Sequence, residues 1–145
     1  GLVAGDAGLL KRFLLYRTYH GSAMSPAVQA ASAAAWDDEQ HVIDNRTAYR
    51  RKFDEVTPIV ASVLQTTRPQ AGFYLWARVP GGDDTAFTRA LYAQYNVLVL
   101  PGSFLSRSSG GSNPGQGWVR IALVDSPERC IDAAGRIREF VSATR

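Results

Sequence analysis

"GQGWVRIALV", residues 115–124, places a permanent cation inside an apolar run. The residues around Arg120 have the composition of a buried β-strand; they are Trp118, Val119, Ile121, Ala122, Leu123 and Val124. An arginine side chain cannot lose its charge, and burying it without a partner is costly. Arg120 therefore needs an anion, and the source of that anion is the main functional question that the sequence raises.

Two arrangements would satisfy Arg120. In the first, it pairs with a carboxylate of the same protein or lies on the solvent face of the strand. In the second, the carboxylate of a ligand binds the guanidinium in a bidentate manner. No acidic residue lies between Asp84 and Asp125, and the polar loop 103–117 precedes the strand. These two features favour ligand binding, but the residues alone leave both arrangements open.

Composition narrows the class of protein. The chain has 145 residues, of which 46% are hydrophobic and 20% charged, the mixture of a soluble globular domain. The net charge is +3, but basic residues alternate with acids instead of forming the basic face of a nucleic-acid-binding protein. No apolar run approaches the roughly 20 residues of a membrane helix. From the charge distribution and the short apolar runs we expect no nucleic-acid or membrane partner. Because the single Cys130 cannot form an internal disulfide, we expect a cytoplasmic protein.

The histidines and the cysteine do not predict a metal site or a nucleophile. Asp37 and His41 are four residues apart, but a third ligand is missing, so a solvated helix start is the better interpretation. His20 precedes Gly21 and is read as a turn residue, although it could line a cleft. Cys130 is expected to be a small buried apolar residue.

The residue pattern predicts an α/β fold in which helices precede a short sheet. Asp6 is expected to cap a helix over about 7–18 that turns Leu10, Phe13 and Leu14 toward a core. Further helix starts are predicted at Ser25 and Ser126, each followed by proline, and at Asp37 or Asp38. A long helix carries one apolar stripe and a predicted kink at Pro58; the stripe consists of Tyr49, Phe53, Val56, Val60 and Leu64.

The second half of the chain shows the residue pattern of a sheet with packed helices. Strands are expected at 73–79, 97–102 and 118–124. One helix presents Phe87, Leu91 and Tyr95 to the core. The last helix presents Ile131, Ala134, Ile137 and Val141.

Four blocks of the sequence resemble, in this order, the C-terminal part of pyridoxal-phosphate aminotransferases of fold type I. They are "SPAVQAA" (25–31), "GFYLWARVP" (72–80), "VLVLPGSFL" (97–105) and "NPGQGWVRIALV" (113–124). The sequences of residues 16–36 and 112–124 are most similar to those of the N-succinyldiaminopimelate aminotransferases of lysine biosynthesis. The resemblance implies the end of a large cofactor domain over 1–36, a long interdomain helix over 37–68 and a small C-terminal α/β domain over 69–145.

The same resemblance implies a function. An enzyme of this family would transfer an amino group between an amino acid and a keto acid, here glutamate and N-succinyl-2-amino-6-oxopimelate. It would use pyridoxal 5′-phosphate as cofactor and would be a homodimer. Arg120 takes the role of the arginine that binds the α-carboxylate of the substrate. Gly102, Ser103 and Asn113 are further candidates because their loop would border the substrate.

The catalytic centre of the family has no counterpart in these residues. The Schiff-base lysine and the phosphate-binding arginine of the family fall upstream of the segment that matches Gly1, and Lys11 and Lys52 match no catalytic position. We therefore expect the chain to be part of a longer protein, to contain no catalytic, cofactor-binding or metal-binding residue, and to be inactive alone. The alternative is a non-catalytic ligand-binding or regulatory module with an aminotransferase-like fold. A lysine about ten residues upstream of Gly1 in the full-length protein would favour the enzyme.

Overall fold

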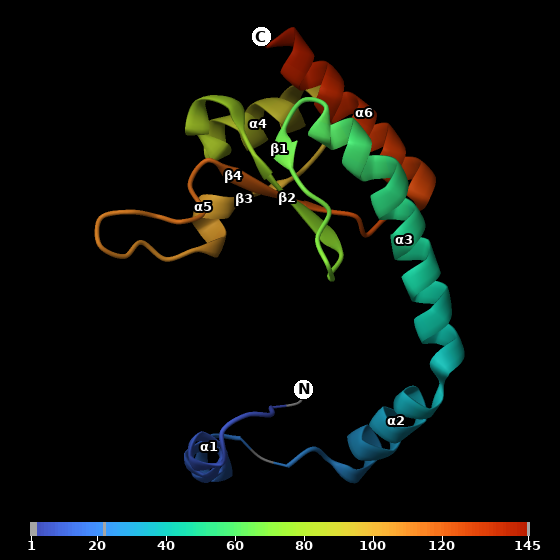
Figure 1. The fold of residues 1–145 in the computed structure, drawn as a ribbon, viewed down its shortest axis with the longest axis vertical. Coiled ribbons are helices and arrows are strands. Elements are labelled where there is room, and N and C mark those ends of the chain that lie inside the picture. Colours follow the sequence, from blue (N-terminus) through green and yellow to red (C-terminus); the bar gives the residue numbers. More distant parts are fainter. Residues whose placement is uncertain (1–2, 22, 145) are drawn as a thin grey trace. The chain divides into compact units, whose positions relative to one another are not determined.

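The computed structural model describes residues 3–21 and 23–144, and these residues form two compact units, 1–42 and 43–145. The first unit contains two helices, α1 (Ala7–His20) and α2 (Pro26–Asp37). Helix α3 (Glu39–Ala61) leads into the second unit (Figure 1). The opening stretch "GLVAGD" (1–6), which the sequence indicates as the end of a strand running into a turn, lies partly outside the described residues, and residues 3–6 form no strand.

The second unit is a small α/β layer. Its strands are β1 (Gln65–Thr66), β2 (Tyr74–Arg78), β3 (Leu100–Pro101) and β4 (Trp118–Ala122). Its further helices are α4 (Asp84–Tyr95), the short α5 (Gly102–Leu105) and α6 (Pro127–Ala143), with a 3-10 turn at Pro80–Gly82. The strand order is β1-β2-β4-β3, and each neighbouring pair is antiparallel.

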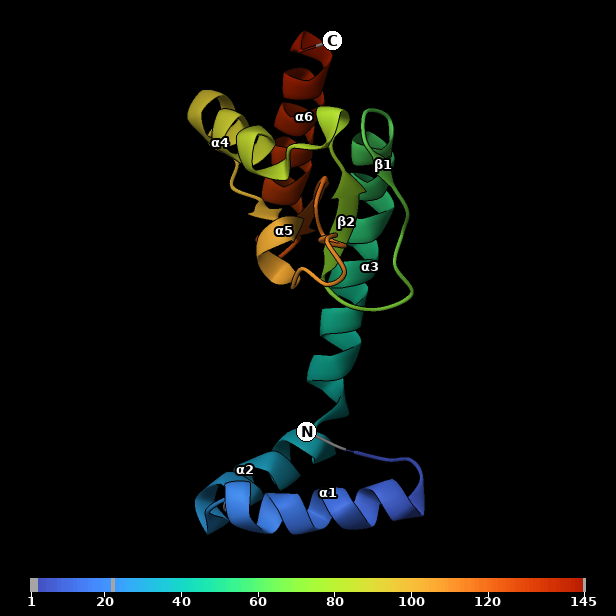
Figure 2. The same cartoon turned by 90° about the vertical axis from the view of Figure 1, so that its left-hand side faces the viewer.

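The sheet is covered by helices on one face. Leu75, Ala77 and Val119 are completely buried, and Ile121 nearly so, because they point toward α3, α4 and α6. Figures 1 and 2 show α3 and α6 on the same side of the sheet. Because side chains alternate along a strand, Arg120 lies on the opposite face. The strand predicted over 118–124 is thus buried on one face only. It is also shorter than predicted, because β4 ends at Ala122.

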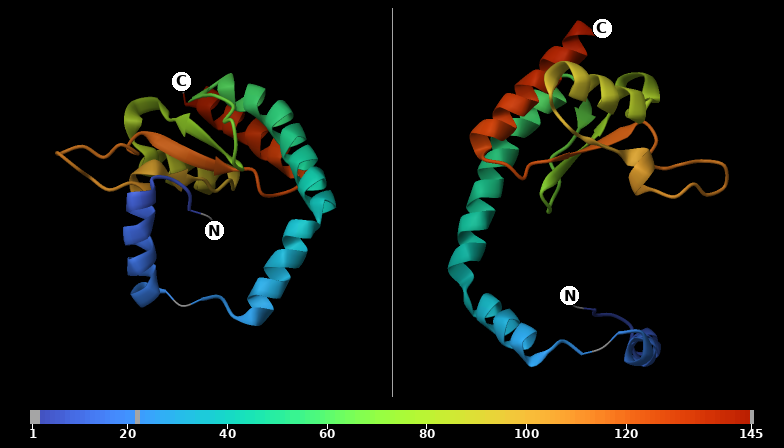
Figure 3. Two further views of the ribbon diagram at one scale, coloured as in Figure 1. Left: turned by 60° about the horizontal axis from the view of Figure 1, so that its bottom comes forward. Right: turned by 180° about the vertical axis from the view of Figure 1, so that it is seen from behind.

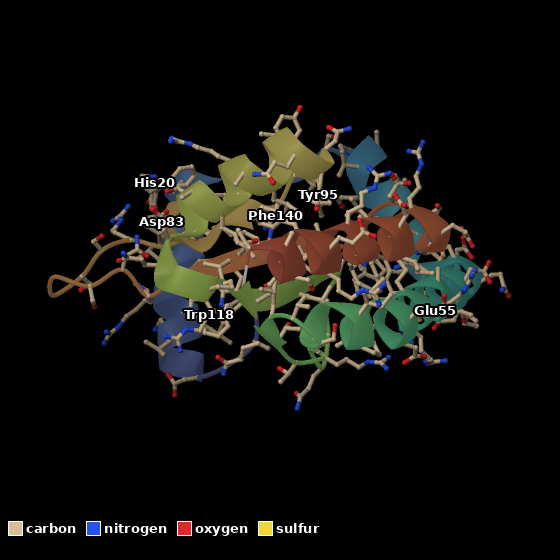
Figure 4. All side chains as sticks on the ribbon, turned by 90° about the horizontal axis from the view of Figure 1, so that it is seen from above. His20, Glu55, Asp83, Tyr95, Trp118 and Phe140 are labelled. Carbon is tan, nitrogen blue, oxygen red and sulfur yellow. The ribbon has the colours of Figure 1, made fainter. Side chains whose placement is uncertain are left out.

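The core joins the apolar stripes of three helices. The buried core residues on α3, α4 and α6 are Phe53, Val56, Val60, Leu91, Cys130, Ala134, Ile137, Phe140 and Val141. Figure 3 shows α3 and α6 side by side, and an ion pair of 3.1 Å joins Arg51 to Glu128 between them. Tyr95 and Phe140 meet between α4 and α6 with ring centroids 5.8 Å apart (Figure 4). The predicted inward faces of α4 and α6 are thus confirmed.

Local capping explains where the helices begin. Asp6 accepts a hydrogen bond from Leu9 N at 2.9 Å, and Asp38 accepts one from Gln40 N at 3.1 Å. Ser25 and Ser126 accept bonds from backbone N–H groups three residues later, and each precedes a proline in the first helical position. All four helix starts agree with the sequence prediction.

Helix α3 ends earlier than the sequence pattern suggested. It continues through Pro58 to Ala61, and the chain then turns, with Leu64 N donating to Val60 O at 2.9 Å. Leu64 remains buried, but the next two residues pair with β2 as strand β1. The apolar stripe therefore persists past the end of the helix because the turn keeps Leu64 on the core side.

Helices α1 and α2 contain no buried residue. The core expected beneath Leu10, Phe13 and Leu14 is not supplied within the described part of the first unit, where Leu14 is 69% exposed. An apolar helix stripe is buried only where a second layer covers it, and this unit has none. None of the described helices combines the length and apolar character needed to span a membrane.

Candidate carboxylate-binding site

Arg120 lies at the centre of the open face of the sheet. Strand pairing places it opposite Trp76 of β2 and Leu100 of β3. Its guanidinium lies over the ring of Tyr74, 5.6 Å from the ring centroid. The side chain is half-buried, and its Nε atom is buried without a hydrogen-bond partner.

The unpaired Nε defines the chemistry of this position. None of the ion pairs among residues 3–21 and 23–144 involves Arg120. A buried N–H group without an acceptor costs about 1–3 kcal/mol. One edge of a guanidinium presents Nε–H together with an Nη–H group, and this pair matches the two oxygens of a carboxylate. Within the described residues, Arg120 therefore forms no ion pair, and its Nε–H has no acceptor.

Arg120 also lines a pocket of about 500 Å³ at the β3 edge of the sheet. Helix α4 contributes Thr85, Thr88 and Arg89 to its wall, and the remaining lining is mostly apolar. The Oγ1 atom of Thr88 is likewise buried without a hydrogen-bond partner. A largely apolar cavity of this size with a few polar groups is typical of small-molecule sites.

An aromatic pair supports the open face beside Arg120. The rings of Trp76 and Trp118 stack with centroids 6.2 Å apart and an interplanar angle of 10°. A side chain at Gly102 would collide with the ring of Trp76 and with the backbone of Gly115. Gly102 therefore lets α5 approach the sheet closely.

The loop between α5 and β4 is closed at its base by hydrogen bonds and projects from the sheet beyond that base (Figure 1). Ser106 Oγ donates to Gly102 O at 3.1 Å, and Asn113 Nδ2 donates to Ser103 O at 3.0 Å. Asn113 Oδ1 accepts bonds from Gly115 N and Ser106 Oγ. The base of the loop thus brings together three candidates, Gly102, Ser103 and Asn113, whose hydrogen bonds shape the loop. Direct contact of these residues with a ligand remains a prediction.

Asp84 is a site residue that the sequence did not reveal. It is 3% exposed, and its oxygens accept hydrogen bonds from Ser103 N at 2.8 Å and Gly117 N at 3.3 Å. Burial acts to raise the pKa of this carboxyl, but these hydrogen bonds outweigh it and hold the pKa below its usual value. In the sequence, Asp84 follows Asp83 in a turn, and nothing distinguishes the buried aspartate from the exposed one.

Comparison with known proteins identifies the family to which this chain belongs. The family model described as aminotransferase class I and II matches residues 7–137. The chain belongs to the class I and II aminotransferase family. Members of this family depend on pyridoxal phosphate, and the four-stranded sheet with its helices is the C-terminal part of the fold type I aminotransferase architecture.

Individual aminotransferases agree with the chain over most of its length. The crystal structure of an aminotransferase from Neisseria meningitidis is 57% identical, with a TM-score of 0.84 over 97% of this chain and 36% of that one. A probable N-succinyldiaminopimelate aminotransferase from Thermus thermophilus is 38% identical, with a TM-score of 0.52 over 63% of this chain and 23% of that one. An LL-diaminopimelate aminotransferase from Natranaerobius thermophilus is 30% identical over 98% of this chain and 36% of its own length.

The chain spans about a third of the length of the curated aminotransferases that it matches. Its described residues do not fit pyridoxal phosphate by themselves. The amine of Lys52 is buried, donates to Leu123 O at 2.9 Å and lies over the ring of Tyr49, and Lys11 is exposed on α1. Lys52 is engaged by the protein itself, and Lys11 lines only an open, mostly apolar hollow on the surface of α1 together with Arg17, so no step through the cofactor is derived from these residues.

The two histidines and the cysteine considered in the sequence analysis are surrounded by other residues of the protein. His41 Nδ1 lies 3.1 Å from Asp38 Oδ2 at the start of α3, and the ring of His20 stacks on that of Tyr16. Cys130 is buried in α6, and burial raises the pKa of its thiol. No group of three or more metal-ligating side chains occurs within the part of the chain that the structure describes.

Proposed function

We propose that this chain is the C-terminal, substrate-binding part of a full-length aminotransferase, and that Arg120 binds the α-carboxylate of its amino-acid and keto-acid substrates. The observation that carries the proposal is the buried, unpaired Nε of Arg120 on the open face of the sheet. No protein carboxylate neutralises this cation within the described residues, so a substrate carboxylate would complete it.

The role of the site would be orientation. A carboxylate held through two parallel hydrogen bonds can rotate little, so the α-carbon next to it is held in one direction. The stacked pair of Trp76 and Trp118 stiffens the strand on which Arg120 lies. Pyridoxal phosphate, bound by residues of the full-length enzyme outside this chain, would supply the electron sink for amino transfer.

We propose glutamate and N-succinyl-2-amino-6-oxopimelate as the substrate pair, in diaminopimelate and lysine biosynthesis. The names of the Thermus and Natranaerobius relatives support this substrate class. The pocket lends further support because Arg89 lines it together with Arg120. Two cations at one pocket suit a substrate that carries more than one carboxylate.

The full-length enzyme is proposed to be a cytoplasmic homodimer in which residues 1–36 pack against the rest of the large cofactor domain. Exposed apolar side chains on the first two helices support that packing, since Tyr19 is 81% and Trp36 84% exposed. Large apolar side chains at such exposure are typical of surfaces that another part of a protein covers.

The test is amino transfer by the full-length enzyme. With glutamate as donor, N-succinyl-2-amino-6-oxopimelate should be used with a kcat/KM at least roughly tenfold above that of pyruvate or oxaloacetate. Preference for a keto acid with a single carboxylate would contradict the substrate assignment. Binding of the same compounds without any amino transfer would instead support the ligand-binding module.

A further inference from the structure

We propose that Asp84 is a positioning residue that ties both ends of the loop 103–117 to the start of α4 and thereby fixes the point at which β4 begins. The proposal concerns the loop itself, and only its expected effect on activity rests on the function proposed for Arg120.

The two oxygens of Asp84 hold opposite ends of the loop. Oδ2 accepts the bond from Ser103 N at 2.8 Å, and Oδ1 accepts the bond from Gly117 N at 3.3 Å. Ser103 lies in α5, at the start of the segment 103–117, and Gly117 immediately precedes β4. One carboxylate thus links two backbone positions that are 14 residues apart in sequence (117 minus 103).

The charge of Asp84 is satisfied by hydrogen bonds from the side chain and backbone of Ser103 and from the backbone of Gly117, without a cation. It takes part in none of the ion pairs found among the described residues, although it is 3% exposed. A buried carboxylate is tolerated only where hydrogen bonds replace water, and the two N–H groups of the loop provide them. Its place in the first turn of α4 adds a favourable interaction with the helix dipole.

Gly117 is held from two directions. Its N–H donates to Asp84, while its carbonyl accepts a bond from Val79 N at 2.9 Å. Its φ of 77° is a conformation that glycine adopts without strain. Because Gly117 directly precedes β4 and Arg120 follows three residues later in that strand, the position of Gly117 bears directly on that of the guanidinium.

The neighbouring aspartate has a separate task and is the matched control. Asp83 accepts a bond from Ala86 N at 2.9 Å and one from Thr85 Oγ1 at 2.8 Å, so it caps α4 without touching the loop. Replacing either aspartate by asparagine removes one charge at the start of the same helix. Only at position 84 would the substitution set an amide NH₂ against a loop N–H.

The experiment compares Asp84→Asn and Asp83→Asn in the full-length enzyme by hydrogen exchange and kinetics. In Asp84→Asn, peptides containing Ser103 and Gly117 should exchange at least about tenfold faster, which corresponds to about 1.4 kcal/mol. Asp83→Asn should leave these peptides unchanged. The kcat/KM for the amino donor should fall roughly tenfold in Asp84→Asn and less than about twofold in Asp83→Asn.

The exchange result separates this proposal from the function of Arg120, because it needs no substrate. Unchanged exchange at both loop ends in Asp84→Asn, or equal acceleration in Asp83→Asn, would overturn the role of Asp84 even if Arg120 binds the substrate. Should Asp84→Asn not fold, Asp84→Glu serves in its place. The longer side chain cannot hold both N–H groups at their present positions, so faster exchange is expected at one loop end, and unchanged exchange at both would overturn the proposal.

Discussion

Lys52 of α3 donates a hydrogen bond of 2.9 Å to the carbonyl of Leu123, 71 residues further along the chain. The side chain of Lys52 is buried, and its ammonium group also lies 4.5 Å from the centroid of the Tyr49 ring. Leu123 directly follows β4, and its own N–H donates to Phe73 O at 2.8 Å. The long helix is therefore attached to the end of the strand that carries Arg120.

Replacing Lys52 with methionine should destabilise the second unit by about 1–3 kcal/mol, because the carbonyl of Leu123 loses its partner in a buried environment. Hydrogen exchange of the buried amides of β4 in the full-length enzyme measures this effect. Lys11→Met removes the same charge on the exposed surface of α1 and should change stability by less than about 0.5 kcal/mol. Equal effects of the two variants would show that the bond to Leu123 contributes nothing.

Arg120→Ala in the full-length enzyme should lower kcat/KM about 30- to 3,000-fold, since losing one member of a desolvated charge pair costs about 2–5 kcal/mol. Arg120→Lys should restore only part of this loss, because an ammonium group cannot form the two parallel bonds of a guanidinium. Steady-state kinetics with glutamate checks both variants. Arg138→Ala, an exposed position on α6, is the control for the loss of charge, and unchanged kinetics in Arg120→Ala would end the assignment.

The 145-residue chain should not carry out amino transfer alone. Lys52 is engaged with Leu123, and Lys11 is exposed at an open hollow of α1, so we expect neither amine to be desolvated and held against a cofactor aldehyde. After mixing with pyridoxal phosphate and reduction with borohydride, mass spectrometry should find no stoichiometric adduct on either lysine. A stoichiometric adduct on one of them, together with transfer from glutamate, would place a catalytic centre in this chain.

Gly115→Ala should destabilise the base of the loop by about 1–3 kcal/mol, because a methyl group there would collide with the carbonyl of Gly102. Gly135→Ala in α6 is the matched comparison, since a methyl group at that position meets no atom within 4 Å. It should raise stability by about 0.5–1 kcal/mol through the lower entropy of the unfolded chain. Hydrogen exchange of the loop and of α6 reports the two effects separately, and stabilisation by Gly115→Ala would contradict the close contact.

Cys130 should react slowly with iodoacetamide in the folded enzyme. Burial raises the pKa of its thiol, so the reactive thiolate is scarcer at pH 8 than for a free cysteine, and the fraction rises only as the pH approaches the raised pKa. Mass spectrometry of the peptide that contains Cys130 should show modification at least about tenfold faster in urea than in buffer. Equal rates in both solvents would show that the side chain is accessible in the fold.

Helix boundaries and strand faces could be predicted from the sequence because their causes are local. Asp6, Ser25 and Ser126 accept bonds from N–H groups three residues away, so short motifs are sufficient to mark these helix starts. The apolar spacing of α6 likewise predicted that Ala134, Ile137 and Val141 are buried, but it did not indicate Phe140. The end of α3 was placed too late because Leu64 continues its apolar stripe after the chain has left the helix.

The candidate site could be predicted only in part. An arginine in an apolar strand already indicated a need for an anion, and this follows from residue chemistry alone. Its position on the open face depends on the packing of three helices against the other face of the sheet. The role of Asp84 was not predictable, because its partners Ser103 and Gly117 lie 19 and 33 residues away.

The amino-acid sequence by itself determined the helix starts, the alternation of β2 and the presence of a cation in an apolar strand. These depend on interactions between residues a few positions apart. Only the tertiary structure decided that Arg120 lies opposite Trp76, that Asp84 holds both ends of one loop and that Lys52 reaches Leu123. Such contacts exist only after distant segments have been brought together, and the burial of the shared core is what compensates the entropy lost in bringing them there.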